Sequence, residues 1–116
     1  MKLAKAFIML VRVLGLAAIV LGCMLWMSGH EPYLGPHIGV GFCVVVLVFV
    51  MGIMALIRKA VGLGVAAILL ALGLPMVGFM QLPLLPHAMG AIQAAHIAIA
   101  LCTIGLAERL YSVIRD

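Results

Sequence analysis

The chain has 116 residues, enough for one domain, and it is far more apolar than a soluble protein. Hydrophobic residues make up 68% of it, charged residues only 9%, and the mean hydropathy is +1.43. A soluble domain of this size buries only part of its surface, so it could not cover so many apolar side chains. The composition therefore excludes a soluble enzyme, a disordered tail and a secreted disulfide scaffold.

Four apolar stretches, each about as long as the 20 residues that cross a bilayer, divide the chain. They cover about 7–28, 36–57, 60–80 and 88–111. Turn-forming residues and the pair Arg58-Lys59 separate them. The stretches are too long for barrel strands and lack an alternating polar face. We expect an all-α integral membrane protein, an antiparallel four-helix bundle in contact with the lipid bilayer.

The distribution of positive charge predicts how these spans are oriented. With four spans, every Lys and Arg falls on one side, and the opposite loops at 29–35 and 81–87 contain none. Cytoplasmic loops carry the excess of Lys and Arg, so both termini are expected in the cytoplasm. The net charge of +4 is therefore a topology signal rather than a sign of nucleic-acid binding.

Small residues recur along all four spans. Inside lipid, helices pack where such residues let their backbones approach, so a compact bundle is expected. The same residues could instead join two copies in a homodimer. The positions are Gly15, Ala18, Gly22 and Gly29; Gly35, Gly39, Gly41 and Gly52; Gly62, Ala66 and Gly73; and Gly90, Ala94, Ala98, Cys102 and Gly105. Pro75 should bend the third span.

Catalytic machinery is not expected in the spans. The carboxylates Glu31, Glu108 and Asp116 lie at span ends, and no acid can orient a base beside a hydroxyl. Small multidrug transporters share the length and the four spans, but they depend on a buried Glu in the first helix, which is missing here. The three cysteines lie in three different spans and read as small apolar fillers.

His96 is the most informative polar residue, because it lies about nine residues inside the fourth span. An ionisable side chain at that depth is costly and should face the interior or a cavity. Gln93, His96 and Thr103 fall on one helical face with Ala100. Two interpretations remain open: a neutral His96 bonded across the bundle to a hydroxyl or carbonyl, or a ligand.

The other histidines are expected near the outer surface. His37 opens the second span with Gly41 one turn below it, His87 opens the fourth span, and His30 lies in the first outer loop. They are either ordinary interfacial residues or part of a ligand cluster. Neutral imidazole binds haem iron, zinc and copper, and the histidines alone do not choose among these.

We expect haem b as the cofactor, because helix bundles house flat cofactors held by inward side chains. The expected binding residues are His37, His96, His87, Gly41 and Gln93, with electron transfer as the function. The architecture resembles that of transmembrane b-type cytochromes, which use paired histidines from facing helices. Counted inward from Arg58 and from Glu108, His37 and His87 each lie 21 residues deep, so His37 and His96 differ by about nine residues in depth, or about 13 Å along straight helices. Three arrangements stay open: span four tilts or starts late, His37 pairs with His87 while His96 supports the pair, or His96 pairs with its copy in a dimer.

A narrower resemblance covers spans two and four. The run His87…Gln93…His96 with Ile104-Gly105-Leu106-Ala107-Glu108, together with Pro36-His37, is similar to a group of short, uncharacterised bacterial four-span proteins. It implies a multi-pass protein of the bacterial inner membrane and brings no activity with it.

Two other functions stay open. The first is a copper or zinc protein, in which His30, His37, His87 and His96 would act with the nine Met and three Cys. The second is a non-catalytic subunit of a larger membrane complex, or a protein that meets a separate redox partner.

Overall fold

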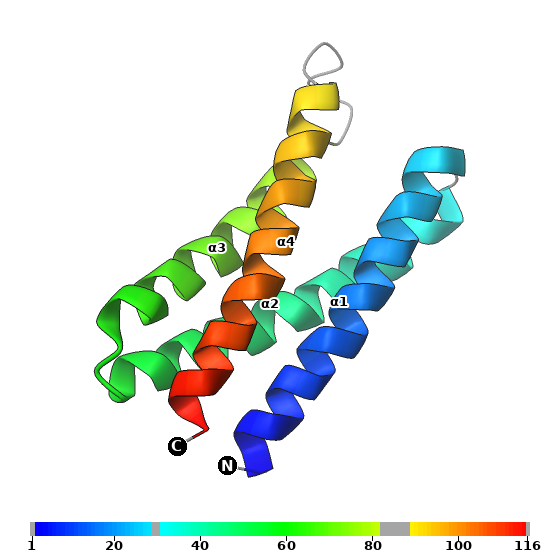
Figure 1. Cartoon of the computed structure of the whole chain (residues 1–116). Coiled ribbons are helices and arrows are strands. Elements are labelled where there is room, and N and C mark those ends of the chain that lie inside the picture. The colour runs from blue at the N-terminus through cyan, green and yellow to red at the C-terminus, as the bar shows by residue number, and fades with distance from the viewer. Residues whose placement is uncertain (1, 29–30, 82–88, 116) are drawn as a thin grey trace.

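The computed structural model describes residues 2–28, 31–81 and 89–115, and within these it is all-helical (Figure 1). The four long helices are α1 (Lys2–Ser28), α2 (Leu34–Ile57), α3 (Val61–Phe79) and α4 (Met89–Ile114). A short 3-10 turn, η1 (Glu31–Tyr33), precedes α2. All four long helices are long and apolar enough to cross a membrane, which confirms the four expected spans. However, α1 starts five residues before the expected span, and α4 continues three residues beyond it.

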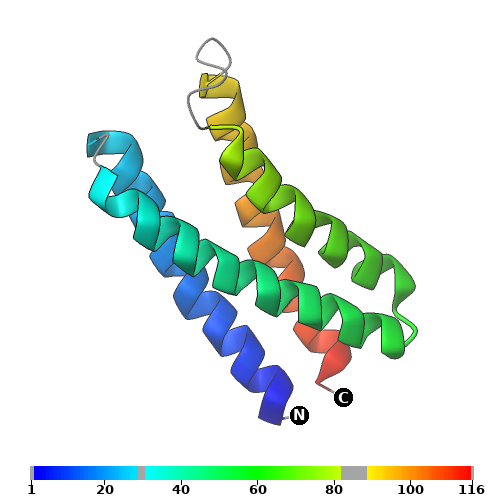
Figure 2. The same ribbon diagram turned by 180° about the vertical axis from the view of Figure 1, so that it is seen from behind.

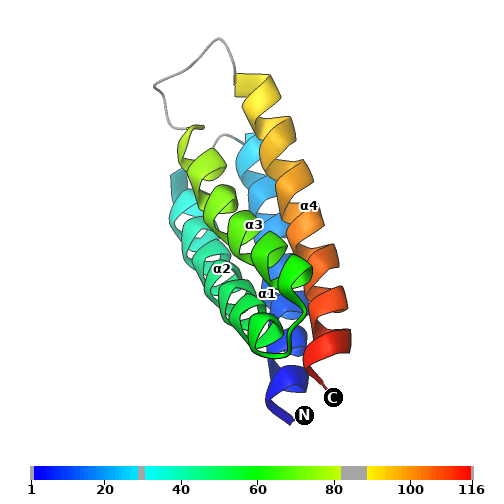
Figure 3. The ribbon, with the colours of Figure 1, turned by 90° about the vertical axis from the view of Figure 1, so that its left-hand side faces the viewer.

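Successive helices run in opposite directions, so both termini and the α2–α3 turn lie at one end of the molecule (Figures 1 and 3). We call this the terminal end and the opposite one the distal end. α2 and α4 touch across the diagonal of the arrangement. In the described part of the chain, α1 and α3 make no contact with each other.

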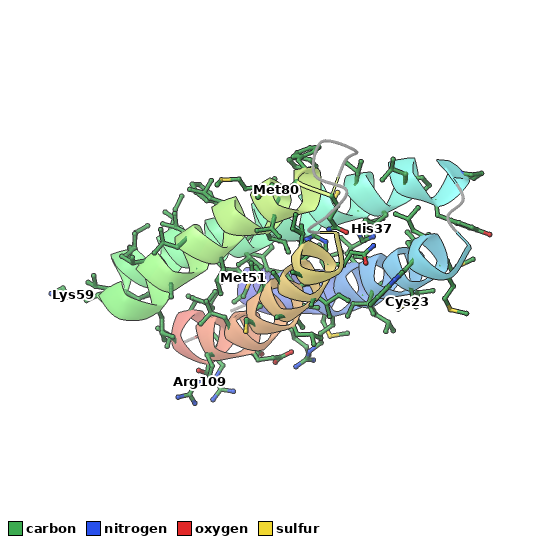
Figure 4. The ribbon with its side chains drawn as sticks, turned by 90° about the horizontal axis from the view of Figure 1, so that it is seen from above. Cys23, His37, Met51, Lys59, Met80 and Arg109 are labelled. Atoms are coloured by element: carbon green, nitrogen blue, oxygen red, sulfur yellow. The ribbon has the colours of Figure 1, made fainter. Side chains whose placement is uncertain are left out.

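The α2–α3 turn is closed by hydrogen bonds that satisfy the last carbonyls of α2. Lys59 N–H donates to Leu56 O and Ala60 N–H donates to Ala55 O, both at 2.9 Å, which is the Schellman arrangement. Lys59 has a φ of 62°, a conformation that glycine usually supplies at this place. Here a lysine occupies it, and Lys59 projects at the tip of the turn (Figure 4).

The packed core fills the terminal part of the molecule and stops short of the distal end. Distal to Gly15, Val44, Leu74 and Thr103, none of the described residues is buried. The largest fully buried side chains are Ile8, Val11, Val48, Met51, Thr103, Leu110 and Ile114. The four helices are therefore tightly joined at one end only.

α2 and α3 approach most closely at a reciprocal glycine contact. A Cβ added to Gly64 would lie 2.6 Å from Leu56 and 2.8 Å from the backbone oxygen of Gly52. A Cβ added to Gly52 would lie 3.0 Å from Ala67 Cβ and 3.2 Å from the backbone oxygen of Gly64. The α2 and α3 backbones meet because neither position carries a side chain.

Gly64→Ala should lower the stability of the protein by about 1–3 kcal/mol, because the added methyl group overpacks this contact. Gly62→Ala is the matched control, since a Cβ at Gly62 meets nothing within 4 Å on the same helix. Thermal unfolding in a mild detergent, followed by circular dichroism, measures both variants. Equal midpoints for the two variants would show that the contact does not govern α2–α3 packing.

α1 and α4 are joined by a two-bond ion pair. Arg12 Nε donates to Glu108 Oε1 at 2.7 Å, and Arg12 Nη2 donates to Glu108 Oε2 at 2.8 Å. The two side chains are 51% and 42% exposed at the surface of the molecule. If lipid surrounds these side chains, each charge is stabilised by the other, because an unpaired charge is costly in lipid.

Removing one partner of this pair should cost more stability than removing both. Arg12→Met leaves the Glu108 carboxylate unpaired and Glu108→Gln leaves the Arg12 guanidinium unpaired, whereas the double variant leaves no charge. We expect the double variant to unfold at a higher temperature than either single variant. Additive losses in this double-mutant cycle would mean that the pair is not energetically coupled.

The small residues divide into packed and open positions. Gly15 and Gly22 contact side chains of other helices, whereas a Cβ at Gly41, Gly73 or Gly105 meets nothing within 4 Å. On α4 the whole series faces outward: Gly90, Ala94, Ala98, Cys102 and Gly105 are all exposed. Self-association through this face stays a prediction, which oxidative cross-linking of Cys102 to Cys102 in membranes would measure. Pro75 lies inside α3, which continues to Phe79.

Candidate histidine ligand site

His37 of α2 and His96 of α4 meet near the distal end of the molecule. Their ring centroids lie 6.0 Å apart and their planes are inclined by 66°. Both residues are partly buried. Figure 4 shows His37 reaching in between the α1–α2 and α3–α4 hairpins. The two imidazoles therefore join the two halves of the chain across the diagonal on which α2 and α4 touch.

The expected difference in depth between His37 and His96 is wrong, because the wrong residue was taken as the inner end of span four. Depth was counted from Glu108, but α4 continues to Ile114. Counted from the helix ends at the terminal side, His37 is 57 − 37 = 20 residues deep and His96 is 114 − 96 = 18 residues deep. The two rings are thus nearly level, as paired ligands require.

The His37 ring is held by α1. His37 Nδ1 lies 2.9 Å from the backbone oxygen of Ala18, and since a carbonyl only accepts, Nδ1 donates. A Cβ on Gly22, one turn further along α1, would lie 3.0 Å from His37 Cε1. Glycine at this position therefore leaves space for the ring, and the carbonyl fixes its rotation. In the neutral ring, this bond leaves the Nε2 lone pair available to a ligand.

The His96 ring lies against α3 in a similar way. A Cβ on Gly78 would lie 3.1 Å from His96 Cε1. The backbone carbonyl of Leu74, one turn before Gly78, is near the ring. His96 Nδ1 is nevertheless buried and forms no hydrogen bond. His37 thus bonds to the neighbouring helix of its own hairpin, and His96 lies beside the Leu74 carbonyl of the neighbouring helix of its hairpin.

The pair lies beyond the packed core. His37, His96 and Gly22 are each seven residues distal to the last buried residue of their helices (44 − 37, 103 − 96 and 22 − 15), and Gly78 is four residues beyond Leu74. Seven residues are about two turns, or about 10 Å of helix. Toward the distal end, the α1–α2 and α3–α4 hairpins diverge (Figure 2). The histidines thus contact each other beyond the last buried residues of their helices.

The remaining predicted site residues are less closely involved. Gly41 and Gln93 are partly buried, and a Cβ at Gly41 meets nothing within 4 Å. Thr103, expected on the same polar stripe as His96, is buried and donates to the backbone oxygen of Ile99 on its own helix at 2.7 Å. His30 and His87 lie outside the described residues.

No group of three or more His, Cys, Asp or Glu side chains that could hold a metal ion occurs among the described residues. Cys23, Cys43 and Cys102 are all exposed on the outside of their helices. An apolar depression of about 440 Å³ lies between α1 and α2, but Leu10, Leu14, Phe42, Cys43, Val46 and Leu47 line it, and it faces lipid. In the described part of the chain, nitrogen ligands converge only at His37 and His96.

Four contacts at this site were missed from the sequence: Ala18 and Gly22 against His37, and Leu74 and Gly78 against His96. The sequence gives no signal that distinguishes these positions, because glycine and alanine recur along every span.

The two rings are in edge contact in this structure, with centroids 6.0 Å apart and planes inclined by 66°. Two imidazoles are fewer ligands than a closed metal site has, so a metal held there would need further ligands.

Comparison with known proteins finds no matching family model, no matching curated protein and no matching solved structure. The resemblances described for the sequence therefore stay predictions.

His37 should carry a proton on Nδ1, because Nδ1 donates to the Ala18 carbonyl. Gly22→Ala should disturb this state, since the new methyl group would collide with the ring, whereas Gly39→Ala should not. Nitrogen-15 NMR of histidine-labelled protein in detergent distinguishes the tautomers. An Nε2–H tautomer in the unsubstituted protein would contradict the assigned bond.

Proposed function

We propose that this protein is a membrane-embedded haem protein that holds haem b between His37 and His96 and transfers electrons. The observation that carries the proposal is the meeting of two imidazoles, one from each hairpin, 6.0 Å apart at the level where the packed core ends. Paired axial histidines give a haem suited to electron transfer, with a potential tuned by its burial.

The residues present suit a porphyrin in three respects. Two neutral nitrogen donors on facing helices match the axial ligation of haem. The Nδ1 bond of His37 to Ala18 O resembles the outer-shell bonds that orient metal-bound histidines. The open position at Gly41, one turn from His37, offers a flat ring access to α2.

The chain itself would bind, orient and insulate the group. His37 and His96 would hold it, and Gly22 and Gly78 would let their rings seat against α1 and α3. The Arg12–Glu108 pair and the Gly52–Gly64 contact hold the helices together at the terminal side, away from the site. When bound, haem supplies the one-electron chemistry for which the chain has no other group.

We further propose that the protein is a multi-pass protein of the bacterial inner membrane with both termini in the cytoplasm. The expectation rests on Lys and Arg, all of which are expected on the terminal side of the four spans. The histidine pair then lies in the outer half of the membrane, within reach of a redox partner in the lipid or outside it.

The proposal predicts a red membrane fraction. Protein produced with haem supplementation should show a Soret band that follows the polypeptide through purification. His37→Ala/His96→Ala should reduce haem per polypeptide at least tenfold. His87→Ala is the matched control, because it removes a histidine of the same chain from outside the pair, and it should retain haem.

Two outcomes would contradict this proposal. A colourless unsubstituted protein after haem supplementation would exclude haem as the cofactor. Loss of haem in His87→Ala with retention in the double variant would move the site away from the His37–His96 pair. Copper or zinc found in the colourless protein by elemental analysis would favour metal binding instead.

A further inference from the structure

Exposed side chains, three of them basic, form a strip along α1 at the terminal end. The members of the strip are Lys2, Lys5, Met9 and Arg12, separated by three or four residues (5 − 2, 9 − 5 and 12 − 9). This spacing puts side chains on one face of a helix, and all four are exposed. The same face continues toward the distal end with Leu16 and Ile19, which are apolar and exposed. The face is therefore basic at the end of the helix and apolar further along.

The end of α4 borders this strip. Figure 1 shows the start of α1 and the end of α4 side by side, and the two helices contact each other. Arg12 of the strip is bound to Glu108 through two hydrogen bonds, and Tyr111, one turn beyond Glu108, also lies near Arg12. The guanidinium carbon of Arg115 lies 5.9 Å from the centre of the Tyr111 ring, within the range of a cation–π contact. Basic side chains thus lie on both sides of the line along which α1 and α4 meet.

This line carries an excess of positive charge. Its charged residues, which we call the basic seam, are Lys2, Lys5, Arg12, Glu108 and Arg115. In the part of the chain that the structure describes, which ends before Asp116, four cations of the basic seam accompany one carboxylate. Arg12 donates two N–H groups to Glu108 and one to Met9 Sδ at 3.7 Å, out of the five that a guanidinium has. The basic seam therefore has both charge and hydrogen-bond donors for an anion.

We infer that the basic seam binds the headgroup of an anionic phospholipid. Basic residues between transmembrane helices attract such headgroups at the membrane surface. A free anion would use the charges alone, whereas the acyl chains of a lipid would also cover the apolar continuation of the strip at Leu16 and Ile19. The side chain of Arg12 reaches back toward the surface, since its Nη1 contacts Met9, one turn nearer the start of α1. The inference does not depend on the proposed haem function.

Native mass spectrometry of the delipidated, haem-free protein measures this binding. Phosphatidylglycerol should be retained at concentrations at which phosphatidylcholine with the same acyl chains is not. Lys2→Gln/Lys5→Gln should weaken phosphatidylglycerol binding about tenfold, because each basic residue near an anionic headgroup strengthens the attraction. Arg58→Gln/Lys59→Gln is the matched control: it removes two exposed charges from the same end of the molecule, at the α2–α3 turn, and should leave the binding unchanged.

A third variant should change the binding in the opposite direction. Glu108→Gln removes the one carboxylate of the basic seam and leaves the Arg12 guanidinium to the lipid. It should therefore bind phosphatidylglycerol more tightly than the unsubstituted protein. A purely structural role of the Arg12–Glu108 pair would not produce this gain.

The outcomes decide between a lipid site and simpler explanations. Equal retention of the two lipids, or equal losses in the two double variants, would mean that only the overall charge acts, and overturns the inference. Release of phosphatidylglycerol by excess inorganic phosphate would mean that the seam takes a free anion, and also overturns it. Circular dichroism and gel filtration check that the variants fold. If one of them does not, the others decide, because each has its own expected direction. The content of haem in the protein bears on the proposed function alone.

Discussion

The arrangement depends on the contact between His37 and His96, which is where the two hairpins meet at their distal ends. A polar ring among apolar helices needs a partner, and each ring rests on a glycine of its own hairpin, Gly22 or Gly78. The glycines bring each imidazole to the interior, and the opposite hairpin supplies the other imidazole. His37 and His96 thus take part both in helix packing and in the ligand binding that we propose.

The His37–His96 contact lies outside the tightly packed part of the molecule. At the terminal side, Gly52 and Gly64 allow α2 and α3 to touch, and Arg12 and Glu108 join α1 to α4. On the distal side of Gly15, Val44, Leu74 and Thr103, none of the described residues is buried. Close packing leaves no room for a guest, so the buried core stabilises the bundle at a distance from the histidine pair.

The sequence predicted the number and approximate limits of the helices, because about 20 apolar residues in a row leave few alternatives. It also drew attention to His96, because an ionisable side chain deep in a span is costly, whereas His37 was expected near the outer surface. It did not predict that they meet, because Glu108 was taken as the membrane edge, whereas it lies within α4, paired with Arg12. Gly64 and Gly78 were missed because a glycine in an apolar helix looks the same whether it faces lipid or another helix.

The most direct measurement is electron paramagnetic resonance of the oxidised, haem-loaded protein, with nitrogen-15 in its histidines only. The account predicts a low-spin iron signal coupled to two histidine nitrogens, with one coupling lost in His37→Ala or in His96→Ala. A signal coupled to no histidine nitrogen, or couplings that survive in both variants, would contradict the claim that this pair holds the cofactor.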